Sequence, residues 1–307
     1  FDKNKVPEKT IELVKEILCF LNISRFTNEN TLCCLLYLKA SLSLRPENDD
    51  IALVQESVIT LSSLTEMAVI IGLYKDPTQY AQLTDPCRGD SGLQNYRRKL
   101  WFSVVSMNMT ELLPNGGCCS INQEYLECFL QRKDQSMSYT ASVVQSMDPK
   151  NLFDLQIHDM LLKEYKLLTV LNELNSSCTS VLSSSPLLKI EKLILKVQET
   201  LEFTFPFSKL TENSGESHKV NIGCLDENIG IDFTKVINSR TFVNNLLTRS
   251  ILLNVTGSLA IYFETLHKEF PFKYTQYFEK FLLEAHKHCF EMIKLLEKYL
   301  GSELDEM

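Results

Sequence analysis

The fold class is decided by residues 186–203, which read PLLKIEKLILKVQETLEF. Apolar side chains recur in this stretch at alternating steps of three and four residues, at Leu187, Ile190, Ile194, Val197 and Leu201. That spacing places them on one face of an α-helix. Two heptads are too few for a coiled coil, so the stretch predicts an amphipathic helix that packs against other helices.

The same spacing extends outward in both directions along the chain. It predicts further helices over about 7–21, 28–45, 50–72, 93–113, 149–175, 234–268 and 272–300. Only 10 Gly and 9 Pro occur among 307 residues, too few for a chain that turns every ten residues. The sequence therefore predicts an all-α fold, a single large domain of about eight or more helices.

Two polar stretches divide this helical pattern. Residues 114–148 and 204–232 carry the Gly and Pro that stop helices, so we expect both to be loops. We therefore expect a helical core over 1–130 and a C-terminal helical half of the same domain over 148–307. A finer signal lies at Gly72, where a left-handed terminating residue is expected, and Asp76-Pro77 makes continuation of that helix unfavourable.

Composition narrows the class of protein. The net charge of −8 opposes direct binding of DNA by this chain alone, because phosphate contacts need clustered Lys and Arg. Ten scattered cysteines indicate a reduced, intracellular protein rather than a disulfide framework. No apolar run reaches the 18 or more residues of a membrane span, so we expect no span. The chain begins at Phe1, and we expect it to be an interior fragment of a longer polypeptide.

Motifs for catalysis are absent from the sequence: it has no phosphate-binding Gly-rich loop, no nucleophile elbow and no His-Glu-x-x-His. We therefore expect no enzyme, no metal site and no cofactor in this chain. His286, His288 and Cys289 share one predicted helix but point in different directions. We interpret them as solvent-facing histidines beside a buried cysteine, with either His able to serve as an axial haem ligand.

Two vicinal cysteine pairs remain. Cys33-Cys34 lies in a helical pattern and is interpreted as core packing. Cys118-Cys119 follows Gly116-Gly117 in a predicted loop, and is a candidate for redox sensitivity or for binding a thiophilic effector.

The densest basic cluster is Arg97-Arg98-Lys99, beside Trp101, the only tryptophan. A phosphate site is one interpretation. The favoured one is structural: the three side chains fan around a helix, one or two pair with carboxylates such as Glu66 or Asp76, and Trp101 packs inside.

Three segments in order carry a family resemblance. They are residues 67–77 (MAVIIGLYKDP), residues 97–102 (RRKLWF), and Gly117 with Ser120-Ile121-Asn122. Together they resemble the regulatory middle homology region of fungal zinc-cluster transcription factors. The motif residues, which we expect to be structural, are Gly72, Asp76, Arg97, Arg98, Leu100, Trp101 and Ile121. The chain departs from the family pattern at Tyr74, Phe102 and Cys118-Cys119.

The resemblance implies a nuclear protein, with shuttling through the cytoplasm allowed. It implies a helical region that controls a neighbouring activation function, in some relatives in response to a small molecule. The partners it implies are a small apolar effector (a sterol, haem, fatty acid or xenobiotic), transcriptional co-regulators and a second copy of the chain. DNA and zinc belong to a binding module outside this chain.

Two other classes of function stay open. A ligand-free helical scaffold of a nuclear assembly needs a filled core and a broad exposed apolar face. A helical enzyme needs a buried, convergent cluster of titratable groups around His158, Asp159 and Glu164.

Overall fold

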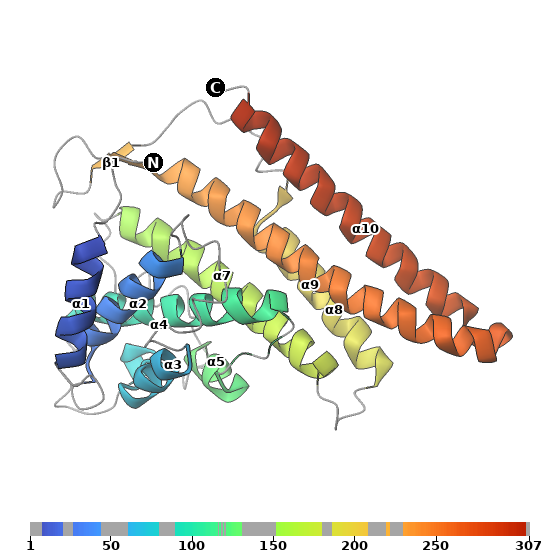
Figure 1. Ribbon diagram of the computed structural model, residues 1–307, viewed down its shortest axis with the longest axis horizontal. Coiled ribbons are helices and arrows are strands. Elements are labelled where there is room, and N and C mark those ends of the chain that lie inside the picture. Colours follow the sequence, from blue (N-terminus) through green and yellow to red (C-terminus); the bar gives the residue numbers. More distant parts are fainter. Residues whose placement is uncertain are drawn as a thin grey trace. The chain divides into compact units, whose positions relative to one another are not determined.

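The computed structural model describes residues 8–20, 27–43, 61–79, 90–115, 117, 119, 121–130, 152–179, 186–207, 219–221 and 230–304 (Figure 1). These residues contain nine α-helices, so the predicted all-α class is confirmed. The chain forms two compact units, one from Phe1–Asn108 with Ser120–His158, the other from Met109–Cys119 with Asp159–Met307. The predicted division between residues 130 and 148 falls outside the described residues and stays a prediction.

The first unit is built around α1 (Glu8–Phe20), α2 (Glu29–Ser43), α3 (Leu61–Ile70), most of α4 (Ser91–Leu112) and α5 (Gln123–Leu130), with a 3-10 turn, η3, at Pro77–Gln79. Asn28 caps α2, because its side chain accepts the Thr31 N–H at 2.9 Å. The apolar stripe of α2 is buried, at Leu32, Leu35, Leu36 and Leu38.

Helix α3 ends in the conformation predicted from the sequence. Gly72 has a φ of 79°. Its N–H donates to the Val69 carbonyl and the Leu73 N–H donates to the Ala68 carbonyl, both at 2.9 Å. This pair of bonds is a Schellman motif, and the apolar contact expected with it joins two fully buried positions, Ala68 and Leu73.

The second unit consists of η5 (Leu113–Asn115), residues 159–179 of α7 (Leu152–Thr179), α8 (Leu187–Thr204), α9 (Phe233–Glu269) and α10 (Pro271–Leu304). Helices α9 and α10 lie side by side as an antiparallel hairpin (Figure 1). The opening stretch of sequence forms α8, and its Ile190, Ile194, Val197 and Leu201 are buried as predicted.

One expectation from the sequence needs correction in this unit. The stretch 204–232, read as a loop, contains two short antiparallel strands, β1 (Lys219–Asn221) and β2 (Gly230–Asp232), with Val220 opposite Ile231. Strands of three residues are too short to show an alternating pattern.

Helix α9 also bears on the expectation that the chain has no membrane span. The segment Thr234–Glu269 of α9 is long and apolar enough to cross a membrane by length and composition. Half of its apolar window is buried inside the unit, and the buried side of α9 also holds Thr241, Asn244, Asn245, Thr248 and Thr256. A core helix of a folded unit has these same properties, so the segment is weak evidence for a span.

Candidate functional site

The basic cluster of the first unit is an internal ion pair. The Arg98 Nε and Nη2 atoms donate to the two carboxylate oxygens of Asp76 at 2.7 and 3.1 Å, and Nη1 donates to Asn95 Oδ1 at 2.9 Å. The Arg98 and Asp76 side chains are at most 1% exposed. Thr78 donates to Asp76 through both its N–H and its hydroxyl. Burial alone would raise the pKa of Asp76, but the bonds and charge of Arg98 and the bonds of Thr78 hold it below its usual value.

The neighbouring motif residues close the same core. Arg97 pairs with Glu29 at 2.9 Å and donates to the Ile71 carbonyl at 3.0 Å. The sequence predicted Asp76 as a partner but gave no sign of Glu29. Leu100, Trp101 and Ile121 are buried, and Trp101 stacks with Phe129 at 6.3 Å between ring centroids. Because Arg97 and Arg98 already form ion pairs and Trp101 is buried, the structure favours the structural interpretation of this cluster over a phosphate site.

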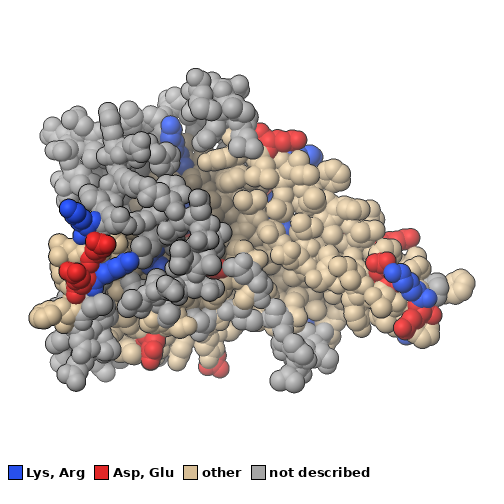
Figure 2. Space-filling view, viewed as in Figure 1, with Lys and Arg blue, Asp and Glu red and all other residues tan. Residues whose placement is uncertain are grey.

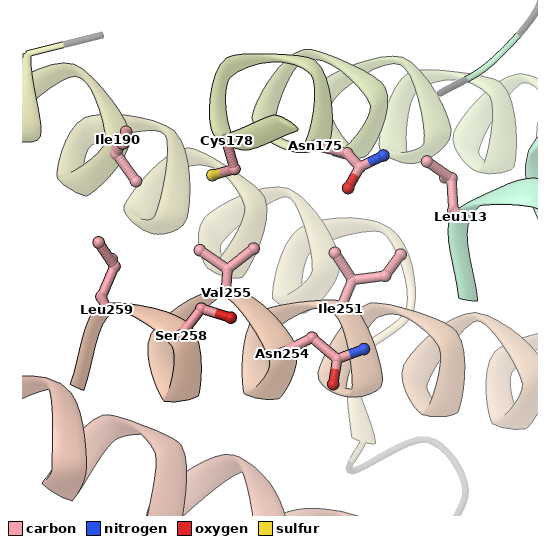
Figure 3. Close-up of a pocket in the computed structure, with 9 residues that line it drawn as sticks. All are labelled: Leu113, Asn175, Cys178, Ile190, Ile251, Asn254, Val255, Ser258 and Leu259. Atoms are coloured by element: carbon pink, nitrogen blue, oxygen red, sulfur yellow. The ribbon is translucent and has the colours of Figure 1, made fainter. Parts of the chain in front are cut away.

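A pocket of about 300 Å³ lies in the second unit (Figure 3). The side chains that line it come from η5, α7, α8 and α9: Leu113, Asn175, Cys178, Ile190, Ile251, Asn254, Val255, Ser258 and Leu259. In Figure 3 the α7 side chains point toward Ile251 and Val255 of α9. Small-molecule sites are commonly apolar concavities with a few polar groups placed between helices, and this pocket has that composition.

One wall of the pocket is tied to a loop. The Asn175 side chain donates through Nδ2 to the Gly117 carbonyl at 2.8 Å. The loop backbone is tight here, since a Cβ on Gly117 would lie 3.1 Å from the Leu112 carbonyl oxygen. A molecule that moved Asn175 would therefore act on the segment that holds Gly117 and Cys119.

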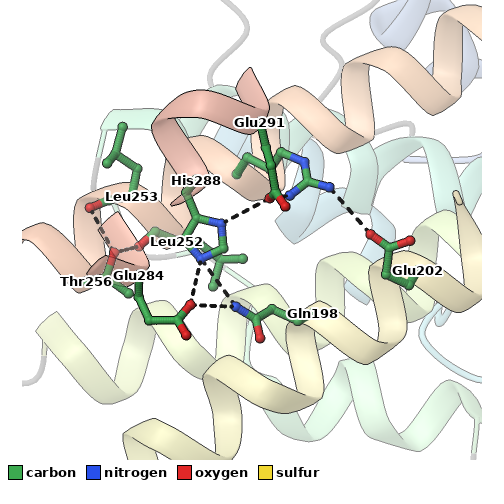
Figure 4. A network of polar contacts seen from close by, with 9 residues as sticks. Gln198, Glu202, Leu252, Leu253, Thr256, Glu284, His288 and Glu291 are labelled. Carbon is green, nitrogen blue, oxygen red and sulfur yellow. Dashed lines mark hydrogen bonds and ion pairs between the residues drawn. The ribbon is translucent and has the colours of Figure 1, made fainter. Parts of the chain in front are cut away.

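A polar network joins α8, α9 and α10 (Figure 4). Arg249 pairs with Glu202 of α8 and with Glu291 of α10. His288 lies beside Gln198 at 3.3 Å, with Glu284 and Glu291 within 4 Å of its ring nitrogens.

The charge state of His288 follows from its surroundings. Burial lowers the pKa of His288 to about 4, against the charge of Glu284 and with the help of the cations Arg249 and Lys287. The imidazole is therefore neutral near pH 7.

The remaining predicted site residues lie apart from the pocket lining. His286 is exposed, whereas His288 is buried and Cys289 is exposed. The sequence interpretation of solvent-facing histidines and a buried cysteine is therefore wrong for the last two, because α10 is rotated so that position 288 faces α8. Cys118 lies outside the described residues, and Cys119 is half-buried.

Other cysteine and titratable positions also differ from expectation. Cys33 is half-buried and Cys34 is exposed, so that pair is not core packing. Asp159 is exposed and pairs with Lys163, while Glu164 is buried and pairs with Arg240 at 3.3 Å. His158 is buried against the Phe102 ring. Among the described residues, no three His, Cys, Asp or Glu side chains are grouped so that they could hold a metal.

The distribution of charge on the surface bears on nucleic-acid binding, which needs clustered basic side chains. On the described part of the face in Figure 2, basic and acidic groups lie next to one another, most densely toward the end of the α9–α10 hairpin. Near the end of α9, Lys268 forms an ion pair with Glu264. The face has no broad basic patch in its described part.

The pocket was not predicted from the sequence, and its residues show why. Its lining comes from four elements between positions 113 and 259, and no local pattern marks residues that meet only in the folded unit. The apolar spacing of 186–203 placed Ile190 in the core but could not show that packing leaves a space beside it.

Comparison with known proteins finds relatives along nearly the whole chain. It is 27% identical to an uncharacterised transcriptional regulatory protein of Saccharomyces cerevisiae over 95% of this chain and 35% of that protein. It is 26% identical to Regulator of drug sensitivity 1 (95% and 34%) and to Oleate-activated transcription factor 1 (98% and 29%), both of the same yeast. The chain thus spans about a third of the length of these relatives. No family model and no solved structure matches.

Proposed function

We propose that this chain is a regulatory region of a fungal zinc-cluster transcription factor, and that it controls an activation function in response to a small molecule. Its similarity to transcriptional regulators of yeast over nearly its whole length supports the first part of the proposal. The observation that carries the sensing step is the pocket of about 300 Å³ between helices of the second unit. In this proposal the chain is not an enzyme, acts in the nucleus and meets DNA only through a separate module.

The mechanism we propose is a population shift. An effector that binds one packing of α7, α8 and α9 better than another favours that packing by its differential affinity. The Asn175–Gly117 hydrogen bond supports this route, because Asn175 lines the pocket and holds the loop at Gly117. The names of two relatives mention drug sensitivity and activation by oleate, and both favour an effector with an apolar part.

A reporter assay tests the proposal. The chain is inserted between a heterologous DNA-binding domain and an activation domain, and reporter output is measured while small-molecule extracts are supplied. Ser258→Trp should fill the rim of the pocket without straining the core, because Ser258 is exposed. Thr265→Trp is the matched control, an exposed position on the same helix outside the lining.

The expected outcome is that Ser258→Trp removes the response while Thr265→Trp keeps it. Native mass spectrometry of the purified chain should show a bound small molecule that Ser258→Trp loses. If both variants respond as the unmodified chain does, the pocket is not the sensing site and the proposal fails.

A second candidate function has its own observation. Exposed apolar side chains follow one another along α10, at Leu283, Phe290, Ile293 and Leu296. Such a stripe is the property expected of the scaffold alternative, which needs no ligand. Replacing Leu283 and Phe290 with Lys should then abolish co-regulator recruitment, measured by pull-down from nuclear extract, while the pocket and its ligand stay intact.

A further inference from the structure

Among the described residues, the lining of the pocket has no charged side chain. Its apolar members are Leu113, Ile190, Ile251, Val255 and Leu259, and its polar members are two amides, one hydroxyl and one thiol. An ionised group that leaves water needs an opposite charge or several hydrogen bonds to offset its desolvation. The lining supplies no cation for a carboxylate or a phosphate.

The polar groups are arranged for neutral hydrogen bonding. Asn254 and Ser258 lie one turn apart on α9, and Asn175 belongs to the opposite wall of the pocket, on α7 (Figure 3). Amides offer both donors and acceptors, and a hydroxyl offers both as well. This set suits a ligand group that also donates and accepts, such as an amide or an alcohol.

The volume limits the size of the occupant. Pockets for drug-sized ligands run from roughly 300 to 1,000 Å³, and the volume of about 300 Å³ lies at the small end. A macrocycle such as haem is too large, and the described lining offers it no histidine as an axial ligand.

From these observations we propose that the pocket binds a compact, uncharged molecule with an apolar body and one amide- or hydroxyl-type group, and that it discriminates against the matching carboxylate. The apolar part packs between Ile190, Ile251 and Val255. The polar group lies between the buried amide of Asn175 and the side chains of Asn254 and Ser258, so that it is partly removed from water. This ligand class rests on the proposed sensing function and deepens it. Of the effectors that the family resemblance implies, it favours a small xenobiotic over a fatty acid or haem.

Cys178 supplies a direct readout of occupancy. It lines the pocket and is open to solvent, so iodoacetamide can reach it in the empty pocket and a bound molecule should shield it. Cys34 and Cys289 are exposed cysteines outside the lining, and they serve as internal controls in the same sample. The rate of alkylation at each cysteine is measured by peptide mass spectrometry on the full chain.

The probes are octanamide and octanoate, which share size and shape and differ in charge. Octanamide at ten times its dissociation constant should slow alkylation of Cys178 about tenfold by mass action, and leave Cys34 and Cys289 unchanged. Octanoate at the same concentration should slow Cys178 far less. Equal or greater protection by octanoate overturns the ligand class and leaves the sensing function standing.

A rim variant tests the chemical reason for this selectivity. Asn254→Lys adds a cation at an exposed position of the lining, so it should reverse the preference of the pocket toward octanoate. If octanoate gains no protection in this variant, the placement of the polar group at Asn254 is wrong. If neither probe protects Cys178 while Ser258→Trp still removes the reporter response, only the ligand class fails. If neither probe protects and Ser258→Trp has no effect, the sensing function fails with it.

Discussion

Gly72 has a left-handed backbone conformation, which disfavours any residue with a side chain. At a φ of 79° a Cβ meets the following carbonyl oxygen, which costs about 1 to 2 kcal/mol. Gly72→Ala should therefore lower the free energy of unfolding of the first unit by that amount, and Gly72→Asn by less, since Asn tolerates this region. Urea unfolding followed by fluorescence of Trp101, the only tryptophan, measures it. Equal stability of the Ala and Gly forms would contradict the Schellman assignment.

Asp76 is the second residue with a large predicted effect. Asp76→Asn leaves the Arg98 charge buried without its counter-ion, and breaking such a pair costs about 3 to 5 kcal/mol. Asp159→Asn is the control, because its exposed pair with Lys163 should be worth under about 1 kcal/mol. Thermal unfolding followed by circular dichroism compares them. Similar losses in both variants would show that the Asp76 pair is not special.

The same carboxylate gives a pH dependence. The pKa of Asp76 is lower in the folded chain than its ordinary 3.8, so its stabilisation is fully present above pH 3.8 and is lost as the pH falls through the folded value. Unfolding of the first unit should therefore become easier in acid. Asp76→Asn should remove that contribution, seen as a flatter plot of urea midpoint against pH below about 4.

At the scale of elements, α9 offers a position that can be improved. Gly257 lies inside this helix, and a Cβ built on it meets nothing within 4 Å. Gly257→Ala should stabilise the second unit by about 0.4 to 1 kcal/mol, since Ala loses less backbone entropy on folding. Gly92→Ala at the start of α4 is the control, because its Cβ would lie 3.1 Å from Asp90 Oδ1, the group that caps the helix. A gain at Gly92 equal to that at Gly257 would refute this reasoning.

The contact of α8, α9 and α10 predicts a pH effect of its own. The pKa of His288 is about 4 in the fold and 6.5 as a free side chain. Below pH 6.5 the imidazole of His288 is therefore protonated in the unfolded chain but stays neutral in the folded chain. The free energy of unfolding falls as the pH drops toward 4, by up to about 3 kcal/mol. His288→Gln, which keeps a polar side chain beside Gln198, should flatten this slope between pH 6.5 and 4 in urea titrations. An unchanged slope would place the titrating group elsewhere.

Element by element, the sequence predicted what local periodicity encodes. Helices α8, α9 and α10 begin and end within a few residues of their expected bounds, because their apolar residues recur at helical spacing and Pro271 separates the last two. The sequence did not predict which side chains are buried where that depends on the rotation of one helix against another. The burial of His288 and the exposure of Cys289 are set by how α10 meets α8 and α9, and one step along a helix turns a side chain by about 100°.

At the scale of the whole chain, net charge makes a simple prediction. With −8 charges overall and mixed signs on the described face of Figure 2, the purified chain should bind duplex DNA negligibly at physiological salt. Fluorescence anisotropy with random and candidate operator duplexes measures this. Sequence-selective binding by the chain alone would show that DNA recognition is not confined to another module.

The hydrogen bond from Asn175 to the Gly117 carbonyl has a thermodynamic consequence. Coupling between two sites is reciprocal: if filling the pocket weakens the hold on Gly117 by some factor, then anything that fixes Gly117 in place weakens ligand affinity by the same factor. A protein or a modification that holds Gly117 in place would therefore change the effector concentration that gives a response, without contacting the pocket.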